Sequence, residues 1–98
     1  MLFRSNLQKA VELAPDLDRA WYNLGLAQQH LGKMPEARAS LDAASARRPQ
    51  EPDYLYALAV LDAQEKRVDD ARRRLEKLLS IHPAYAPAIQ LLGRLQAP

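Results

Sequence analysis

Three prolines recur at the same position of a repeating unit in this 98-residue chain, and their spacing limits the folds that the chain can adopt. The position of a residue within the repeating unit is called its phase. They follow one another at intervals of 34 residues, and two further sets of residues keep the same interval. A fixed period of this length indicates a stack of similar supersecondary units, each of which packs on its neighbours. The three sets are Pro15, Pro49 and Pro83; Leu24, Leu58 and Leu92; and Gly25, Ala59 and Gly93.

The apolar residues follow a helical period almost throughout, with turn residues between the helical stretches. Turns of two to five residues join antiparallel helices, so the sequence predicts an all-α fold of stacked helix hairpins. We expect Asp16 to cap the second helix and Gly32 to end it in the left-handed conformation. The expected helices cover about residues 2–14, 17–31, 35–47, 53–65, 68–81 and 87–97.

The composition narrows the classes of protein to be considered. Hydrophobic residues make up 48% and charged residues 27%, which is typical of an ordered domain. No cysteine is present, so disulfides and thiolate metal sites are excluded.

The formal charge of +2 does not require a nucleic-acid or membrane partner, and no apolar run reaches the length of a membrane span. We expect neither nucleic-acid binding nor membrane insertion. No export signal is visible, which favours the cytoplasm but leaves the compartment open.

One segment carries a characteristic order of residues. Residues 20–27 read Ala-Trp-Tyr-Asn-Leu-Gly-Leu-Ala, and Gly32, Ala37, Leu41, Ala44 and Pro49 follow. This order resembles the signature of the tetratricopeptide repeat (TPR). A second copy is more degenerate, because Leu55 replaces the tryptophan and Ala59 replaces the glycine. Lys66 stands where this family usually has glycine between the two helices, so we expect strain in that turn.

The resemblance covers essentially the whole chain and implies a single TPR domain. It implies an α-α superhelix, or TPR solenoid, built from antiparallel helix hairpins. Residues 1–15 resemble the second helix of a partial repeat, and residues 16–49 and 50–83 resemble full repeats. Residues 84–98 resemble the first helix of a further partial repeat.

The resemblance also implies that non-core positions on the first helix of each repeat line a concave groove for a partner protein or peptide. Tyr22 and Tyr56 share one phase and Leu26 and Val60 another, which predicts a mainly apolar strip. Tyrosine suits an interface, and an amphipathic helix or extended segment would fit such a groove. In the alternative interpretation, the two tyrosines only pack between neighbouring helices. The expected groove residues are Asp18, Tyr22, Leu26, Gln29, His30, Asp53, Tyr56, Val60, Ala63, Gln64, Gln90 and Arg94.

The basic run at residues 72–74 raises the question of nucleic-acid binding. Successive residues of a helix are rotated by about 100°, so the three arginines point in different directions. Asp69 and Asp70 lie four residues before Arg73 and Arg74, and Glu76 lies four residues after Arg72. At this spacing opposite charges pair on a helix. We therefore interpret the run as a solvated helix face.

The sequence offers little for catalysis. His30 and His82 are its only histidines, and it contains no HExxH motif and no glycine-rich phosphate loop. The serines are not paired with a base. We expect no enzyme activity, no catalytic residue, no metal site and no cofactor.

Both terminal helices of the expected array carry apolar residues that a neighbouring helix would normally cover. Either the chain is part of a longer array, or its ends meet those of another copy and form a homo-oligomer. The leading function is a protein-interaction scaffold, and the alternative is a structural segment that self-associates. A third interpretation is an accessory repeat region beside a catalytic domain outside these residues. The residues expected to mediate self-association are Leu2, Phe3, Leu7, Val11, Ile89, Leu92 and Leu95.

Overall fold

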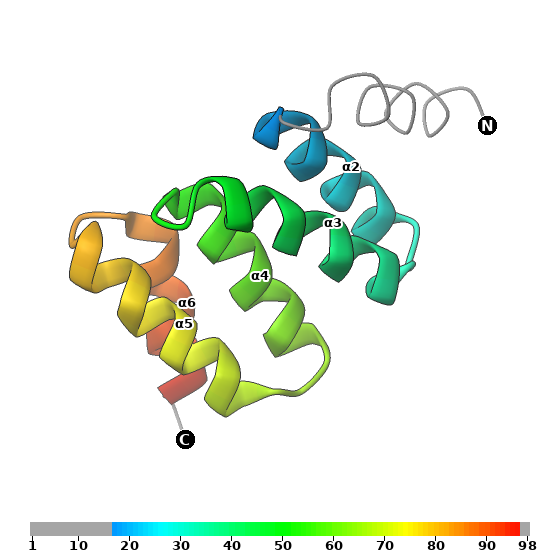
Figure 1. Cartoon of the computed structure of the whole chain (residues 1–98). Coiled ribbons are helices and arrows are strands. Elements are labelled where there is room, and N and C mark those ends of the chain that lie inside the picture. The colour runs from blue at the N-terminus through cyan, green and yellow to red at the C-terminus, as the bar shows by residue number, and fades with distance from the viewer. Residues whose placement is uncertain (1–16, 97–98) are drawn as a thin grey trace. The chain divides into compact units, whose positions relative to one another are not determined.

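The computed structural model describes residues 17–96, and these residues form helices joined by short turns, with no strand among them (Figure 1). Residues 1–16 and 97–98 lie outside the described residues, and with them the helix expected at 2–14. The chain divides into two compact units between Pro49 and Gln50, and each is described by itself. The helices are α2 (Asp18–His30) and α3 (Met34–Arg47) in the first unit, and α4 (Pro52–Gln64), α5 (Val68–Ile81) and α6 (Ala86–Gln96) in the second.

The two ends of α2 are closed by backbone groups. The cap residue at its start is Leu17, whose carbonyl oxygen accepts hydrogen bonds from the N–H groups of Ala20 and Trp21 at 3.1 and 3.4 Å. The expectation of an Asp16 cap is therefore wrong, because α2 begins one residue later and its cap has no side-chain hydrogen bond. At the other end, Gly32 has a φ of +79°, which confirms the expected left-handed conformation.

In the first unit α2 and α3 pack closely because Gly25 has no side chain. A Cβ atom on Gly25 would lie 2.7 Å from Cγ of Leu41 and 3.3 Å from the carbonyl oxygen of Ala37. Leu41, Ala37 and Ala44 on α3 are fully buried. The glycine thus sets how near the two helices approach.

The turn between α4 and α5 contains the one non-glycine residue with positive φ among the described residues. Lys66 has a φ of +63°, in the left-handed region that costs a residue with a Cβ roughly 1–2 kcal/mol. The N–H of Lys66 bonds to Ala63 O at 3.1 Å, and the N–H of Arg67 bonds to Asp62 O at 2.7 Å. These bonds hold the turn closed, and the strain expected at Lys66 is confirmed.

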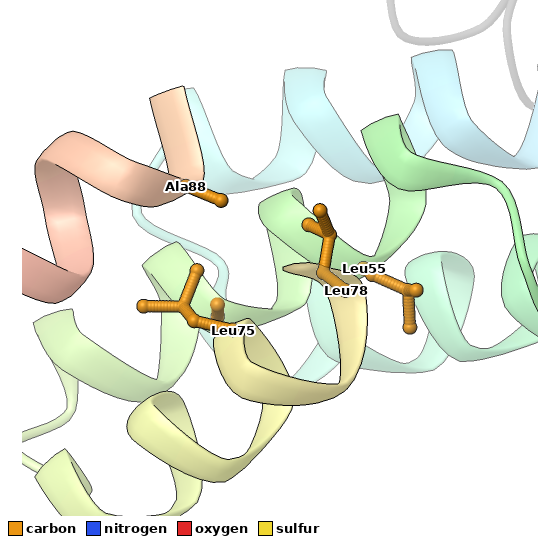
Figure 2. Close-up of a cluster of buried hydrophobic side chains, with 5 residues drawn as sticks. Leu55, Leu75, Leu78 and Ala88 are labelled. Atoms are coloured by element: carbon orange, nitrogen blue, oxygen red, sulfur yellow. The ribbon is translucent and has the colours of Figure 1, made fainter. Parts of the chain in front are cut away.

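The core of the second unit is formed by all three of its helices. Figure 2 shows the buried cluster, to which α4 contributes Leu55, α5 contributes Leu75 and Leu78, and α6 contributes Ala88. Each of these side chains is buried. The half-buried hydrophobic residues that pack against this cluster are Tyr56, Leu79, Tyr85, Leu91, Leu92 and Leu95.

Each hairpin also contains one polar contact at equivalent positions. In the first unit, the hydroxyl of Ser40 donates to Oε1 of Gln28 at 2.6 Å, and both residues are buried. In the second unit, Nε of Arg74 lies 3.0 Å from Oδ2 of Asp62, which is 1% exposed. Gln28 and Asp62 are 34 residues apart, as are Ser40 and Arg74. The repeat therefore preserves a polar contact whose chemistry differs between the two copies.

Candidate protein-binding site

The expected strip in the first unit lies along α2. Tyr22 and Leu26 are both half-buried and are four residues apart, so they occupy the same side of the helix. The guanidinium carbon of Arg19 lies 5.1 Å from the centroid of the Tyr22 ring, within the range of a cation–π interaction. Gln29 is half-buried, and His30 is exposed at the end of the helix.

Asp18, also expected in the groove, contacts the end of its own hairpin. Its Oδ2 lies 3.3 Å from Nε of Arg48, just after α3. The Asp18 side chain is 16% exposed and that of Arg48 is 65% exposed, so solvent screens the pair and it adds little stability. Asp18 at the start of the hairpin therefore contacts Arg48 at its end. The sequence analysis did not predict this contact.

In the second unit, the expected residues of α4 meet the start of α6. The ring of Tyr56 lies 5.9 Å from that of Tyr85, and the two planes are tilted by 56°. The Tyr85 hydroxyl donates to Oδ1 of Asp53 at 2.8 Å. One side of Tyr56 thus packs against a neighbouring residue, as the alternative interpretation expected. Of the other expected residues on α4, Val60 and Ala63 are half-buried and Gln64 is exposed.

The strip changes character in α6. Gln90 stands at the phase of Tyr22 and Tyr56, and Arg94 stands at the phase of Leu26 and Val60. Gln90 and Arg94 are both exposed. The apolar character of the strip therefore belongs to α2 and α4, and α6 offers polar groups at the same phases.

The residues expected to mediate self-association fall into three groups. Ile89 is 49% exposed on α6. Leu92 and Leu95 are half-buried because they pack against the cluster in Figure 2. The remaining residues, Leu2, Phe3, Leu7 and Val11, lie outside the described residues.

Each arginine of the basic run contacts an aspartate, but all three of the expected partners are wrong, including Glu76 for Arg72. Arg72 bonds to Asp69 and Arg73 bonds to Asp70, in both cases three residues apart along α5. Arg74 does not pair with Asp70, because its side chain reaches Asp62 on α4. The run as a whole is therefore accompanied by three carboxylates.

Two further features concern ligands and membranes. Within residues 17–96, no group of three or more histidine, cysteine, aspartate or glutamate side chains could hold a metal ion. None of the helices in that range is long and apolar enough to cross a membrane.

Comparison with solved structures supports the repeat fold. The crystal structure of MamA has a TM-score of 0.87 and 28% sequence identity, covering 94% of this chain and 54% of that one. The crystal structure of YrrB, described as a TPR protein with an unusual peptide-binding site, has a TM-score of 0.82 and 27% identity, covering 87% of this chain and 44% of that one. The chain thus spans about half the length of these solved structures. No curated protein sequence matches it.

Comparison with protein families gives two matches, both described as tetratricopeptide repeat. One covers residues 4–61 and the other covers residues 53–85. Together with the helix hairpins, these matches confirm the expected all-α TPR fold class. Since the first match alone covers more than half of the sequence, the chain belongs to the tetratricopeptide repeat family.

Proposed function

We propose that this chain is a protein-interaction module that binds a segment of a partner protein along the first helices of its repeats. Membership of the TPR family supports this role, because helical repeat arrays serve as binding surfaces for other proteins. The similarity to YrrB, which is described as having a peptide-binding site, supports it as well. The partner segment would be an amphipathic helix or an extended peptide.

The observation that carries the proposal is the pair formed by Tyr22 and Leu26. Their half-buried side chains lie one helical turn apart on α2. Such a pair offers an apolar surface that is held in place by the hairpin beneath it. Tyrosine contributes a large contact area at a low cost in side-chain entropy. An apolar side chain of the partner would pack against this pair.

The second unit contributes in a different way. Tyr56 is held by Tyr85, so its ring is fixed before a partner arrives. Val60, one turn further along α4, is half-buried and accessible in part. A partner would therefore meet a preorganised aromatic edge, which lowers the entropy lost on binding.

The proposed role is non-catalytic and needs no cofactor. His82 has a structural contact, since its Nε2 lies 2.8 Å from the carbonyl oxygen of Gln50. His30 is exposed at the end of α2. The aspartates beside the run at residues 72–74 support a protein partner over a nucleic acid, because they offset its positive charge.

Selection of binding peptides followed by calorimetry would test the proposal. A random peptide library is selected against the 98-residue chain, and the Kd of the best peptide is measured for the wild type and two variants. Tyr22→Ala should weaken binding by roughly tenfold or more and lower Tm only slightly, by the loss of the Arg19 contact. The matched control, Glu76→Ala, changes an exposed residue of α5 and should leave the Kd unchanged. A lower Tm with an unchanged Kd would instead assign Tyr22 to packing.

Self-association is a second candidate function. The observation that favours it is the exposure of Ile89 on α6, where 49% of this large apolar residue remains accessible. Isolated exposed hydrophobic residues are common on protein surfaces. Ile89 gains significance because α6 is open nearby as well: no atom of residues 17–96 lies within 4 Å of the place that a Cβ of Gly93 would take.

A further inference from the structure

An open hollow of about 290 Å³ lies on the second unit, and residues of α4 and α5 line it. Three cationic side chains and one carboxylate of α5 surround Leu55 of α4, an apolar residue that is only 3% exposed. The residues from α5 are spaced by three and four positions, so they share one face of that helix. The five residues that form this basic hollow are Leu55, Asp70, Arg73, Arg74 and Lys77.

The packing of a hairpin does not require cations at these phases. The first hairpin has no basic residue at the equivalent positions of α3, and it still buries Ser40 where the second hairpin has Arg74. Arg73 and Lys77 therefore add a charge that the repeat fold itself does not need. The residues at the phases of Asp70, Arg73, Arg74 and Lys77 are Glu36, Ala39, Ser40 and Ala43.

Both arginines of the basic hollow keep hydrogen-bond donors for a ligand. Nε of Arg74 donates to Oδ2 of Asp62, and one terminal nitrogen of Arg73 donates to Oδ1 of Asp70. These are the hydrogen bonds that the two guanidinium groups make within residues 17–96. A guanidinium group carries five N–H donors, so each arginine can still donate to a second acceptor.

Lys77 gives the basic hollow its net positive charge. Asp70 accompanies Arg73, and the buried Asp62 accompanies Arg74. The ammonium group of Lys77 is exposed and has no hydrogen bond or ion pair with any residue of the described range. An anion that enters the hollow would therefore meet one uncompensated cation beside two guanidinium groups.

We propose that the basic hollow binds a glutamate or aspartate side chain from an acidic segment of a partner protein. The two arginines already bind carboxylates of this chain, and a guanidinium group matches the geometry of a carboxylate. In a bound glutamate, the methylene groups would lie over Leu55 while the carboxylate reaches Lys77.

The size of the basic hollow favours a side chain over the other anionic ligands. Its volume of about 290 Å³ is below the range of about 300–1,000 Å³ that is typical of pockets for small molecules and cofactors. A nucleic acid is bound through phosphate contacts that repeat along its strand, whereas the hollow is a single site. The hollow lies on the second helix of its hairpin, so this inference is independent of binding along the first helices.

The test measures the Kd of a fluorescein-labelled peptide of ten glutamates for the 98-residue chain by fluorescence anisotropy. Low salt is used because salt screens exposed charges. The double variant Arg73→Ala, Lys77→Ala copies Ala39 and Ala43 of the first hairpin, so it should keep its Tm and bind roughly tenfold more weakly. The matched control, Arg67→Ala with Arg72→Ala, removes two positive charges outside the hollow and should weaken binding less than roughly threefold.

The single variant Lys77→Glu gives a second test at an exposed position. It should weaken binding of the ten-glutamate peptide and strengthen binding of a ten-lysine peptide, each by roughly tenfold. If the two double variants lose the same affinity, the attraction is general to the surface and the proposed site is wrong. A wild type that does not bind ten-glutamate peptide at millimolar concentration would also overturn it.

Two further probes separate a carboxylate site from a phosphate site. Inorganic phosphate and a ten-residue oligothymidylate are titrated against the wild type and against the Arg73→Ala, Lys77→Ala variant. We expect both probes to bind more weakly than the ten-glutamate peptide. Tighter binding of either probe, lost in that variant, would assign the hollow to phosphate and contradict an acidic protein segment. The Tyr22→Ala measurement tests the first helices separately, so the failure of one proposal leaves the other standing.

Discussion

Asp62 and Arg74 form an ion pair at the two repeat positions that Gln28 and Ser40 occupy in the preceding hairpin. The carboxylate of Asp62 is 1% exposed, and its partner side chain is 30% exposed. Both pairs join the first helix of a hairpin to its second helix, and in both the two residues are 12 positions apart in the sequence. The phase of a residue within the repeat therefore determines its neighbour even where the residue type has changed.

Replacing Arg74 by alanine should destabilise the protein strongly. The change leaves the buried Asp62 carboxylate without its cation, and we expect a loss of about 2–4 kcal/mol in the free energy of unfolding. The double variant Asp62→Gln, Arg74→Ser copies the pair of the first hairpin and should recover much of that loss. Urea denaturation followed by circular dichroism measures both effects. A double variant no more stable than Arg74→Ala would contradict the equivalence of the two pairs.

Replacing Gly25 and Gly93 by alanine should change the free energy of unfolding in opposite directions, although the two glycines stand at equivalent repeat positions. Gly25→Ala places a methyl group against Leu41 and should lower the free energy of unfolding by about 1–3 kcal/mol. Gly93→Ala meets no atom of residues 17–96 within 4 Å and should raise the free energy of unfolding by up to about 1 kcal/mol, because alanine favours helix. Thermal denaturation at low protein concentration compares the two. Equal effects would show that Gly25 does not set the approach of α2 and α3.

Relief of strain at Lys66 should stabilise the turn between α4 and α5. Lys66→Gly removes the cost of a side chain at a φ of +63°, although glycine also makes the unfolded chain more flexible. We expect a net gain of about 0.5–1 kcal/mol. The reciprocal change, Gly32→Ala, places a side chain at a φ of +79° and should destabilise. A loss of stability in Lys66→Gly would mean that the lysine side chain stabilises the turn.

Removal of the Tyr85 hydroxyl should weaken the attachment of α6 to α4. Tyr85→Phe deletes the hydrogen bond to Asp53 but keeps the ring that contacts Tyr56, so the expected loss is about 0.5–1.5 kcal/mol. Hydrogen exchange of the α6 amides should rise more than that of α2 and α3. Uniform exchange across the chain would contradict a local role for this bond.

The sequence alone predicted the helices and the closing glycine because those features are local. Apolar period, proline and glycine positions define the helices to within a residue or two, and the left-handed conformation of Gly32 follows from its place after α2. The contacts of Asp53 and Arg74 were not predicted, since their partners are distant in sequence: Tyr85 just before α6 and Asp62 on α4. Helix spacing alone favoured Asp70 as the partner of Arg74, and the capping pattern favoured Asp16 where the structure has Leu17.

The candidate binding residues were found by their phase, and phase alone cannot separate an exposed surface from a packing contact. Tyr22 and Tyr56 are equivalent in the repeat, yet the ring of Tyr56 contacts that of Tyr85, whereas the ring of Tyr22 contacts the guanidinium of Arg19. Arg19 over Tyr22 occupies the position that Asp53 has in the following repeat. The pair Gln28–Ser40 could have been found from its 34-residue equivalence to Asp62 and Arg74, because both positions remain polar in otherwise apolar stripes.

An NMR titration of the 98-residue chain with the selected peptide tests the central claim most directly. At 11.0 kDa the chain is suited to following every backbone amide. We predict that the largest shifts on peptide addition occur at amides of α2 and α4 around Tyr22, Leu26 and Val60. Shifts confined to the exposed sides of α3 and α5, around Glu36 and Glu76, with α2 and α4 unchanged, would contradict binding along the first helices.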